Sequence, residues 1–254
     1  MTNMTCFEQK QQRINDFLIR ANQILPCDNP LFFSGSFISG QTENPDILFI
    51  GINPGHRQWH DLVGRHANTK LVPFQPQPCK FITASQTGNR FAKRVIDIAC
   101  DGDIHKLNHC AETSLLSYFA SPTESVVKAQ IKQLPKAMQK EHRELTELDF
   151  TAINPKHIVC IGWRTFDEFI KRYGNDNTKD GDKENREGRS AMQTKQMPIA
   201  INGKGSAEKM MDYYARAEVA GIPVHGVRHF STPLSRAMLE DMKAIFRGVW
   251  EEIL

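Results

Sequence analysis

The stretch DILFIGINPG, residues 46–55, joins a short apolar run to an Asn-Pro-Gly turn. An apolar run of this length that is closed by turn residues is typical of a buried strand that enters a tight loop. Three further stretches that contain apolar residues lie at residues 113–119, 157–162 and 223–227. They predict three more strands.

Amphipathic segments lie between and around these runs. Residues 5–25 carry apolar side chains at three-and-four spacing, which predicts an opening helix. Further helices are expected at residues 89–100, 122–148 and 163–173, and a closing helix is expected to follow the loop at 229–233. Strands that alternate with helices imply parallel β-α-β units, so we expect a three-layer α/β fold. We expect residues 1–254 to form a single domain.

Two segments do not fit this pattern. Residues 56–88 are rich in Gln, His, Pro and Thr and show no clear period. A loop of that length inside a compact domain is usually functional or disordered. Residues 174–190 contain no large apolar side chain, so we expect an exposed polar insertion at about 174–195, outside the core.

The composition excludes several classes of protein. Hydrophobic residues make up 40% and charged residues 24% of the 254 residues, which excludes disordered, collagenous and fibrous chains. No apolar run approaches the roughly 18 residues of a membrane helix, and the N-terminus does not resemble a secretory signal. The net charge of +3 permits a nucleic-acid partner. The cysteines are dispersed with no Cys-x-x-Cys pair, which argues against zinc ribbons and disulfide scaffolds and favours a reducing, cytoplasmic compartment. They are Cys6, Cys27, Cys79, Cys100, Cys110 and Cys160.

Two strand ends carry polar groups that suit a binding site. The first is residues 51–56, with an amide side chain and glycines that permit close backbone approach. The second is residues 228–236, with an imidazole, hydroxyls and an arginine just before a helix. Open parallel sheets bind ligands outside the carboxyl ends of their strands, and a helix N-terminus attracts anions. A simple turn and a capped helix start are the alternative interpretations of these two segments.

These segments resemble the motifs of the uracil-DNA glycosylase superfamily. Residues 51–55 (GINPG) look like the first motif of its mismatch-specific branch, and residues 229–235 (HFSTPLS) look like the second motif of the superfamily. Residues 89–96 (NRFAKRVI) resemble a helix of the mismatch-specific branch, and residues 155–162 (PKHIVCIG) resemble the penultimate strand. The four matches occur in the family's order.

The resemblance implies a central four-stranded parallel sheet between helices, and an enzyme that flips a damaged base, most simply uracil, out of DNA. The enzyme then hydrolyses the N-glycosidic bond, which builds positive charge on the sugar and negative charge on the leaving base. Asn53 would position water, and neutral His229 would donate to the developing oxyanion. This pairing of Asn with His most resembles the single-strand-selective branch. No metal or other cofactor is implied, and a monomer with DNA as its partner is expected.

The resemblance also assigns residues that would contact base and DNA. The base would be held by the backbone at the first motif, by a stacking aromatic residue and by Ser114, which stands where the family has an Asn. Leu234 would fill the gap left in the base stack, and its neighbours would grip phosphates. The base-binding residues are Gly51, Ile52, Pro54, Gly55, His56, Ser114 and Phe81, with Phe74 as the alternative aromatic; the DNA-binding residues are Ser231, Pro233, Leu234, Ser235 and Arg236.

Some features depart from the family or leave alternatives open. The second motif has one extra residue before Pro233, and the hydroxyl of Ser114 cannot provide the paired groups of an amide. These departures favour the alternative of a non-catalytic nucleic-acid- or nucleotide-binding protein on the same fold. A glycosylase for another base, thymine or hypoxanthine, is a further alternative. His225 and His229 have metal-ligand spacing, but they lie in a predicted strand and loop instead of a helix, so we expect no metal site.

Overall fold

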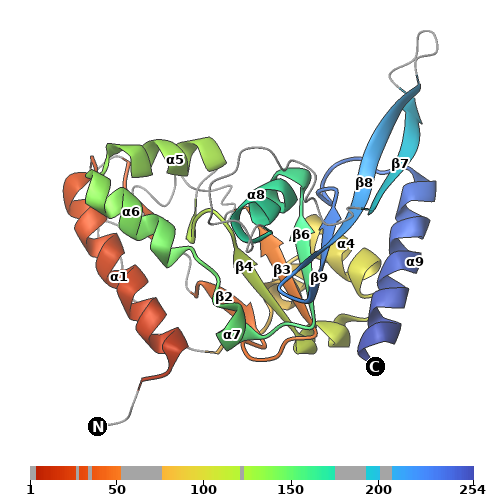
Figure 1. The fold of residues 1–254 in the computed structure, drawn as a ribbon, viewed down its shortest axis with the longest axis horizontal. Helices are drawn as coiled ribbons and strands as arrows, with labels where there is room; N and C mark the ends of the chain where they lie inside the picture. The colour runs from red at the N-terminus through yellow and green to blue at the C-terminus, as the bar shows by residue number, and fades with distance from the viewer. Residues whose placement is uncertain are drawn as a thin grey trace, which may run out of the picture.

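A seven-stranded mixed sheet lies at the centre of the computed structural model, with helices on both of its faces (Figure 1). The structure describes residues 4–26, 29–33, 36–52, 76–120, 123–174, 193–200 and 208–254. In spatial order the strands of this sheet are β2 (Ile38–Gly40), β4 (Cys110–Ser114), β3 (Ile47–Gly51), β6 (His157–Ile161), β9 (Ile222–Val227), β8 (Glu208–Val219) and β7 (Gln193–Ala200). A separate antiparallel pair joins β1 (Phe32–Phe33) to β5 (Phe119–Ala120).

The α/β class is confirmed, but the sheet is larger and more mixed than the expected four-stranded parallel sheet. Parallel pairing runs through β4, β3, β6 and β9. At one edge β2 pairs antiparallel with β4, and at the other edge β8 and β7 add two antiparallel strands. Antiparallel strands on an otherwise parallel sheet are common in folds of this class.

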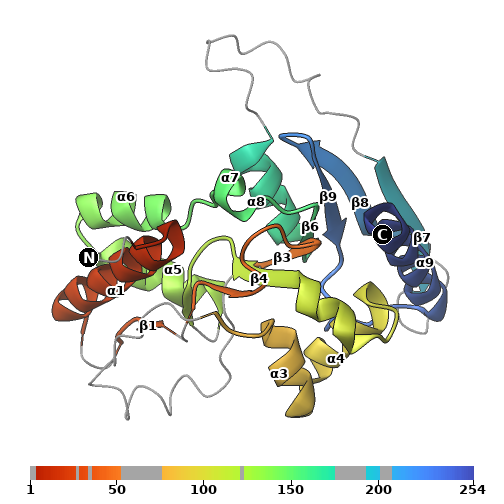
Figure 2. The same ribbon diagram turned by 90° about the horizontal axis from the view of Figure 1, so that it is seen from below.

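Alternate residues of the central strands feed two separate hydrophobic cores. Leu48 and Ile50 of β3 belong to the first core, while Ile47 and Phe49 belong to the second. The first core is shared with the helices α1, α5, α6, α7 and α8, and the second with α3, α4 and α9 (Figure 2). The helices are α1 (Cys6–Ile24), α3 (Lys80–Gln86), α4 (Arg90–Ala99), α5 (Glu124–Gln133), α6 (Lys136–Leu145), α7 (Phe150–Ile153), α8 (Trp163–Tyr173) and α9 (Arg236–Ile253), with a 3-10 turn η1 (Ile104–His109).

Side-chain caps fix where several helices begin. Thr5 and Glu8 form a reciprocal capping box at α1, with the Glu8 N–H donating to the Thr5 hydroxyl at 3.2 Å. The Asn89 side chain accepts from the N–H groups of Phe91 and Ala92 at the start of α4. These signals explain why helices predicted at 5–25 and 89–100 lie within a residue or so of the observed bounds.

Two predicted elements are wrong in detail. The strand expected at 113–119 is β4, at Cys110–Ser114, and its apolar continuation turns away to form β5. The helix expected at 122–148 is two helices, α5 and α6, separated at Leu134 and Pro135. Proline lacks an N–H and disfavours helical geometry in the preceding residue, and Leu134 is accordingly extended, with ψ of 155°.

The antiparallel ribbon of β7 and β8 was not predicted. Its first strand begins at Gln193, inside the insertion expected at about 174–195, and residues 175–192 lie outside the described residues. Within β8, only the residues from Tyr214 onward pair with β9. The earlier residues of β8 pair with β7 alone, and this part of the ribbon projects beyond the sheet (Figure 1). Within the described ranges, no helix combines the length and apolarity needed to cross a membrane.

Candidate active site at the carboxyl edge of the sheet

The strand registers bring the ends of four strands to one edge. Ser114 of β4 pairs with Gly51 of β3, and Ile161 of β6 pairs with Val227 of β9. Ile50 pairs with Cys160, so Gly51 and Ile161 lie level in the sheet. The chain therefore leaves the sheet at the carboxyl ends of the parallel strands after both Gly51 and Val227, the two strand ends that the sequence singled out. This is the edge at which open parallel sheets bind ligands.

His229 lies in the loop after β9, with its imidazole stacked on the ring of Phe91. The two ring centroids are 4.9 Å apart and the planes differ by 17°. The side chain of His229 also approaches Gly162, the N-cap residue of α8, where an added Cβ would lie 3.7 Å from two side-chain atoms of His229. Gly162 has φ of +98°, a conformation that other residues rarely adopt. The position of His229 is thus defined by α4 and by the turn between β6 and α8.

The hydrogen bonds of His229 define which nitrogen carries its proton. The backbone N–H of Ser231 donates to Nδ1 at 3.3 Å, and the Ser231 hydroxyl lies 2.6 Å from the same atom. Because a backbone N–H can only donate, Nδ1 accepts and the proton of the neutral ring lies on Nε2. Among the described residues Nε2 has no hydrogen-bond partner. Partial burial of the ring lowers the pKa of His229, which favours the neutral form.

The loop that carries His229 is held by hydrogen bonds within itself and from α4. The Thr232 N–H and hydroxyl both donate to the His229 carbonyl, at 2.9 and 2.6 Å. Nε of Arg228 donates to the Thr232 hydroxyl oxygen at 2.9 Å. From α4, one guanidinium nitrogen of Arg94 donates to the carbonyls of Phe230 and Thr232, at 2.6 and 3.2 Å. Hydrogen bonds from charged donors are the stronger kind, so Arg94 is the main link between α4 and this loop.

Ser114 and Gly51 lie opposite each other at the ends of β4 and β3. Ser114 is 4% exposed, and its hydroxyl has no hydrogen-bond partner among the described residues. Strand alternation puts Ser114 on the same face as Cys110, which belongs to the core shared with α3 and α4. Among the described residues, a Cβ added to Gly51 would meet only a backbone oxygen of Thr113, at 4.0 Å. A planar ligand at this position would therefore find a hydroxyl and no obstructing side chain from β3.

The backbone carbonyls at the end of β3 are already engaged. Gly51 and Ile52 accept from the N–H groups of Leu115 and Leu116, each at 2.9 Å. The next four residues assigned to this site, Asn53, Pro54, Gly55 and His56, lie outside the described residues.

Phe81, the preferred stacking aromatic, is part of the core. It is 6% exposed, and its ring packs edge-on against Phe49 at 5.5 Å and against Phe91 at 5.8 Å. A side chain packed in this way offers no open ring face, so the structure gives no support to a base-stacking role. The alternative, Phe74, lies outside the described residues.

The residues assigned to DNA lie on the loop and the first turn of α9. The Ser235 hydroxyl accepts from the Met238 N–H at 3.2 Å and caps α9, so the capped-helix interpretation holds for this residue. Leu234 is half-buried against the second core, while Pro233, Ser231 and Arg236 are exposed. The exposed residues form the outer surface of the loop, beside His229.

Three residues at this site were not among the predicted site residues: Phe91, Arg94 and Gly162. Phe91 was quoted as part of a family motif, and that was the available signal, since the segment NRF caps α4 and supplies the ring beneath His229. Arg94 acts on backbone carbonyls, which no sequence pattern reveals.

His225, the other histidine of the pair with metal-ligand spacing, lies away from the candidate active site. His225 is buried in β9, where its ring contacts His157 at 3.1 Å and the Tyr214 hydroxyl at 2.8 Å. In the part of the chain that the structure describes, no group of three or more His, Cys, Asp or Glu residues could hold a metal ion. No family model matches this chain, and no curated protein matches it.

Proposed function

We propose that this protein is a DNA glycosylase of the uracil-DNA glycosylase type, which flips a damaged base out of DNA and hydrolyses its N-glycosidic bond. Uracil is the first substrate to test. One observation carries the proposal: His229 is held as a neutral imidazole whose Nε2 proton has no partner among the described residues, at the strand ends where α/β sheets bind ligands.

The chemistry of glycosidic cleavage suits this histidine. As the bond breaks, negative charge develops on an oxygen of the leaving base, and a donor already in position stabilises it without reorganisation. Stacking on Phe91 and the N–H of Ser231 hold the ring before any substrate arrives. Asn53, which follows Ile52 directly in the sequence, would orient the attacking water. The reaction requires no cofactor, and DNA is the expected partner of a monomer.

Ser114 is the proposed contact to the edge of the flipped base. Ser114 is a buried residue whose hydroxyl lacks a partner among the described residues, and a hydroxyl can either donate or accept. A hydroxyl discriminates less between a carbonyl and an amino group than a fixed amide does. We therefore expect a broader range of bases than strict uracil specificity, with thymine and hypoxanthine as the next candidates.

A non-catalytic nucleic-acid- or nucleotide-binding protein on the same fold is the second candidate. Two observations favour it: Phe81 is packed in the core, and Ser114 replaces the amide expected for reading a base. This candidate predicts DNA binding without release of a base.

A single-turnover assay separates the two candidates. Oligonucleotides carrying one uracil, mispaired thymine, hypoxanthine or alkylated base are incubated, as single strands and duplexes, with excess protein. Loss of one preorganised donor costs roughly a hundred- to a thousand-fold in rate, and His229→Ala should show this loss with DNA affinity nearly intact. His105→Ala, an exposed histidine on η1, is the matched control. Binding without release of any base by the wild-type protein would establish the second candidate, and equal rates for wild type and His229→Ala would remove His229 from the chemistry.

A further inference from the structure

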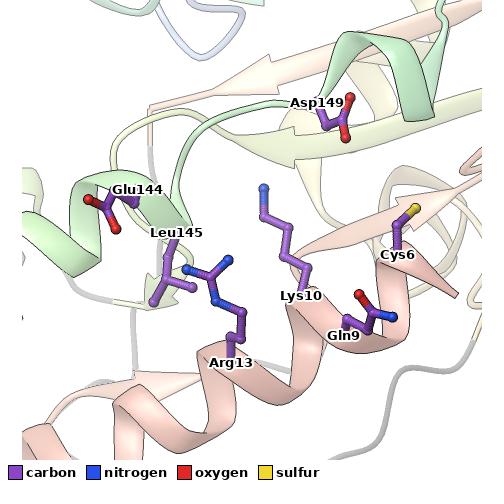
Figure 3. Close-up of a pocket in the computed structure, with 7 residues that line it drawn as sticks. All are labelled: Cys6, Gln9, Lys10, Arg13, Glu144, Leu145 and Asp149. Carbon is purple, nitrogen blue, oxygen red and sulfur yellow. The ribbon is translucent and has the colours of Figure 1, made fainter. Parts of the chain in front are cut away.

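A polar pocket lies away from His229, between α1 and the segment that joins α6 to α7 (Figure 3). Its volume is about 240 Å³. Asp149, which lines it, caps α7 just before the amino end of β6, whereas His229 follows the carboxyl end of β9. The pocket therefore lies near the amino ends of the parallel strands, and the candidate active site lies at their carboxyl ends. Two cations, Lys10 and Arg13, project into the pocket from one face of α1.

The ammonium of Lys10 is held in place by direct contacts with uncharged groups. Its Nζ donates to the backbone carbonyl of Glu147 and lies over the rings of Phe37 and Tyr118, 5.2 and 5.6 Å from their centroids. No carboxylate of the described residues lies within ion-pair distance of it. The side chain is thus fixed in direction by neutral groups.

The acidic residues of the pocket are already engaged with other groups. Glu144 forms an ion pair with Lys140 at 3.7 Å on α6. The Asp149 carboxylate accepts from the Ala152 N–H at 3.0 Å. Arg13 is exposed and has neither an ion pair nor a hydrogen bond to any described residue. The two cations are three residues apart on one helix, where like charges repel.

We infer that Lys10 and Arg13 form a second ligand site, which takes a phosphate-like oxyanion between them. An oxyanion would relieve the repulsion between the two cations and would accept from the planar guanidinium and from the ammonium together. Arginine suits such a ligand because its fork matches two oxygens, and lysine adds a point charge. The source of the oxyanion is either a phosphate of a nucleic-acid backbone or a free phosphorylated small molecule. The inference does not depend on glycosylase activity.

Protonation of Lys10 gives this site a pH dependence that can be measured. Burial is the main cause that lowers the pKa of Lys10 to about 8; Arg13 acts in the same direction, while Asp149, Glu147 and Cys6 oppose the shift. An oxyanion binds the charged amine, so it raises this pKa, and its affinity falls as the pH rises through about 8. Sulfate is the probe of choice because its own charge does not change in this range.

Calorimetric titration of the full chain with sodium sulfate, at constant ionic strength and at pH 7.0 and 9.5, tests the inference. We expect one saturable site that weakens at least several-fold at the higher pH. Each lost charge-assisted hydrogen bond weakens binding by about tenfold or more, so Lys10→Gln and Arg13→Gln should both show this loss. Lys136→Gln, which removes an exposed cation from α6, is the matched control and should bind as the wild type does. Arg13 is exposed, so Arg13→Gln should not disturb folding. If Lys10→Gln fails to fold, sulfate binding by Arg13→Gln alone decides the test.

Duplex DNA distinguishes the two sources. A backbone phosphate at this site predicts that sulfate and a short undamaged duplex compete, and that Arg13→Gln reduces the salt slope of duplex binding by about one. A free phosphorylated molecule predicts unchanged duplex binding in both variants. Sulfate binding that is absent, or that is equal in the wild type, Lys10→Gln and Arg13→Gln, would overturn the inference.

Discussion

The imidazole of His229 lies nearly parallel to the ring of Phe91, with the ring centroids 4.9 Å apart. Phe91 in turn packs edge-on against Phe81, and Phe81 packs edge-on against Phe49 of β3. A continuous row of aromatic rings therefore connects the buried strand to the histidine at the sheet edge. The orientation of the exposed imidazole is set by the core, which is what preorganisation of a donor requires.

Replacement of Phe91 by leucine tests this row. Leucine keeps an apolar side chain at the position but removes the flat surface beneath the imidazole. An aromatic pair contributes about 0.5–1.5 kcal/mol, so Phe91→Leu should slow single-turnover excision by up to roughly tenfold. DNA affinity should stay close to that of the wild type. An excision rate in Phe91→Leu that equals the wild-type rate would show that the stacking does not position His229.

The link from Arg94 to the loop gives a second prediction. Arg94→Gln removes the donor to the Phe230 and Thr232 carbonyls, so the loop that carries His229 should loosen. Charged hydrogen bonds contribute about 1.5–3 kcal/mol, and we expect excision to slow by roughly tenfold or more. Single-turnover rates at saturating protein separate this effect from weaker DNA binding.

The neighbouring residue supplies the control for Arg94. Lys93 is exposed on the same helix, and Lys93→Gln removes the same charge without touching the loop. If both variants lose affinity alike and neither changes the saturated rate, Arg94 acts only through its charge on DNA. A slower saturated rate in Arg94→Gln alone supports its positioning role.

Excision by a Leu234→Ala variant distinguishes whether Leu234 acts in base flipping or in packing. Its side chain is half-buried against the second core, so it retains exposed apolar surface next to His229. If Leu234 enters the duplex, Leu234→Ala should reduce excision from paired DNA far more than from single strands, since unstacking costs a few kcal/mol only in the duplex. Equal losses on the two substrates, together with a lower melting temperature, would assign Leu234 to packing.

The parts of the fold that the sequence predicts are those with a strong local signal. The strands β3 and β6 are buried in the middle of the sheet and read as nearly continuous apolar runs. The helix expected at 163–173 is α8, which begins after a glycine and ends before another. The break at Pro135 has an equally local cause, and the single long helix was therefore an avoidable error.

The missed elements depend on partners far away in the sequence. In β8, polar residues such as Asp212 and Arg216 are exposed, while Tyr214 is buried against His225, so its apolar pattern is incomplete. Its strand identity comes from pairing with β9 and β7. The same reason applies to the site: sequence patterns locate the two strand ends, but the contact between Phe91 and His229 arises from tertiary packing.

Acidification should destabilise the protein through three buried histidines. Burial lowers the pKa of His142 to about 4 and that of His225 to about 3, and it lowers the pKa of His157 as well. Arg172 adds to the effect at His142, and Arg216 adds to it at the other two, while Glu252 opposes it at His157. Unfolded histidine titrates near 6.5, so below about pH 6.5 the unfolded chain binds protons that the folded chain does not.

The sign of the pH dependence follows directly. Stability is fully present above about pH 6.5 and falls as the pH decreases toward the folded pKa values of about 4 and 3. Each of these histidines should contribute a slope of up to roughly 1.4 kcal/mol per pH unit in that window. Urea unfolding at pH 7.0, 6.0 and 5.0 measures the total slope. His142→Gln should be less stable at pH 7.0, because the ring packs against both Phe17 and Phe119, yet its stability should depend less steeply on pH. The exposed His105→Gln is the control for loss of a histidine. An acid slope that is the same in His142→Gln and the wild type would mean that the folded protein protonates His142 as readily as the unfolded chain does.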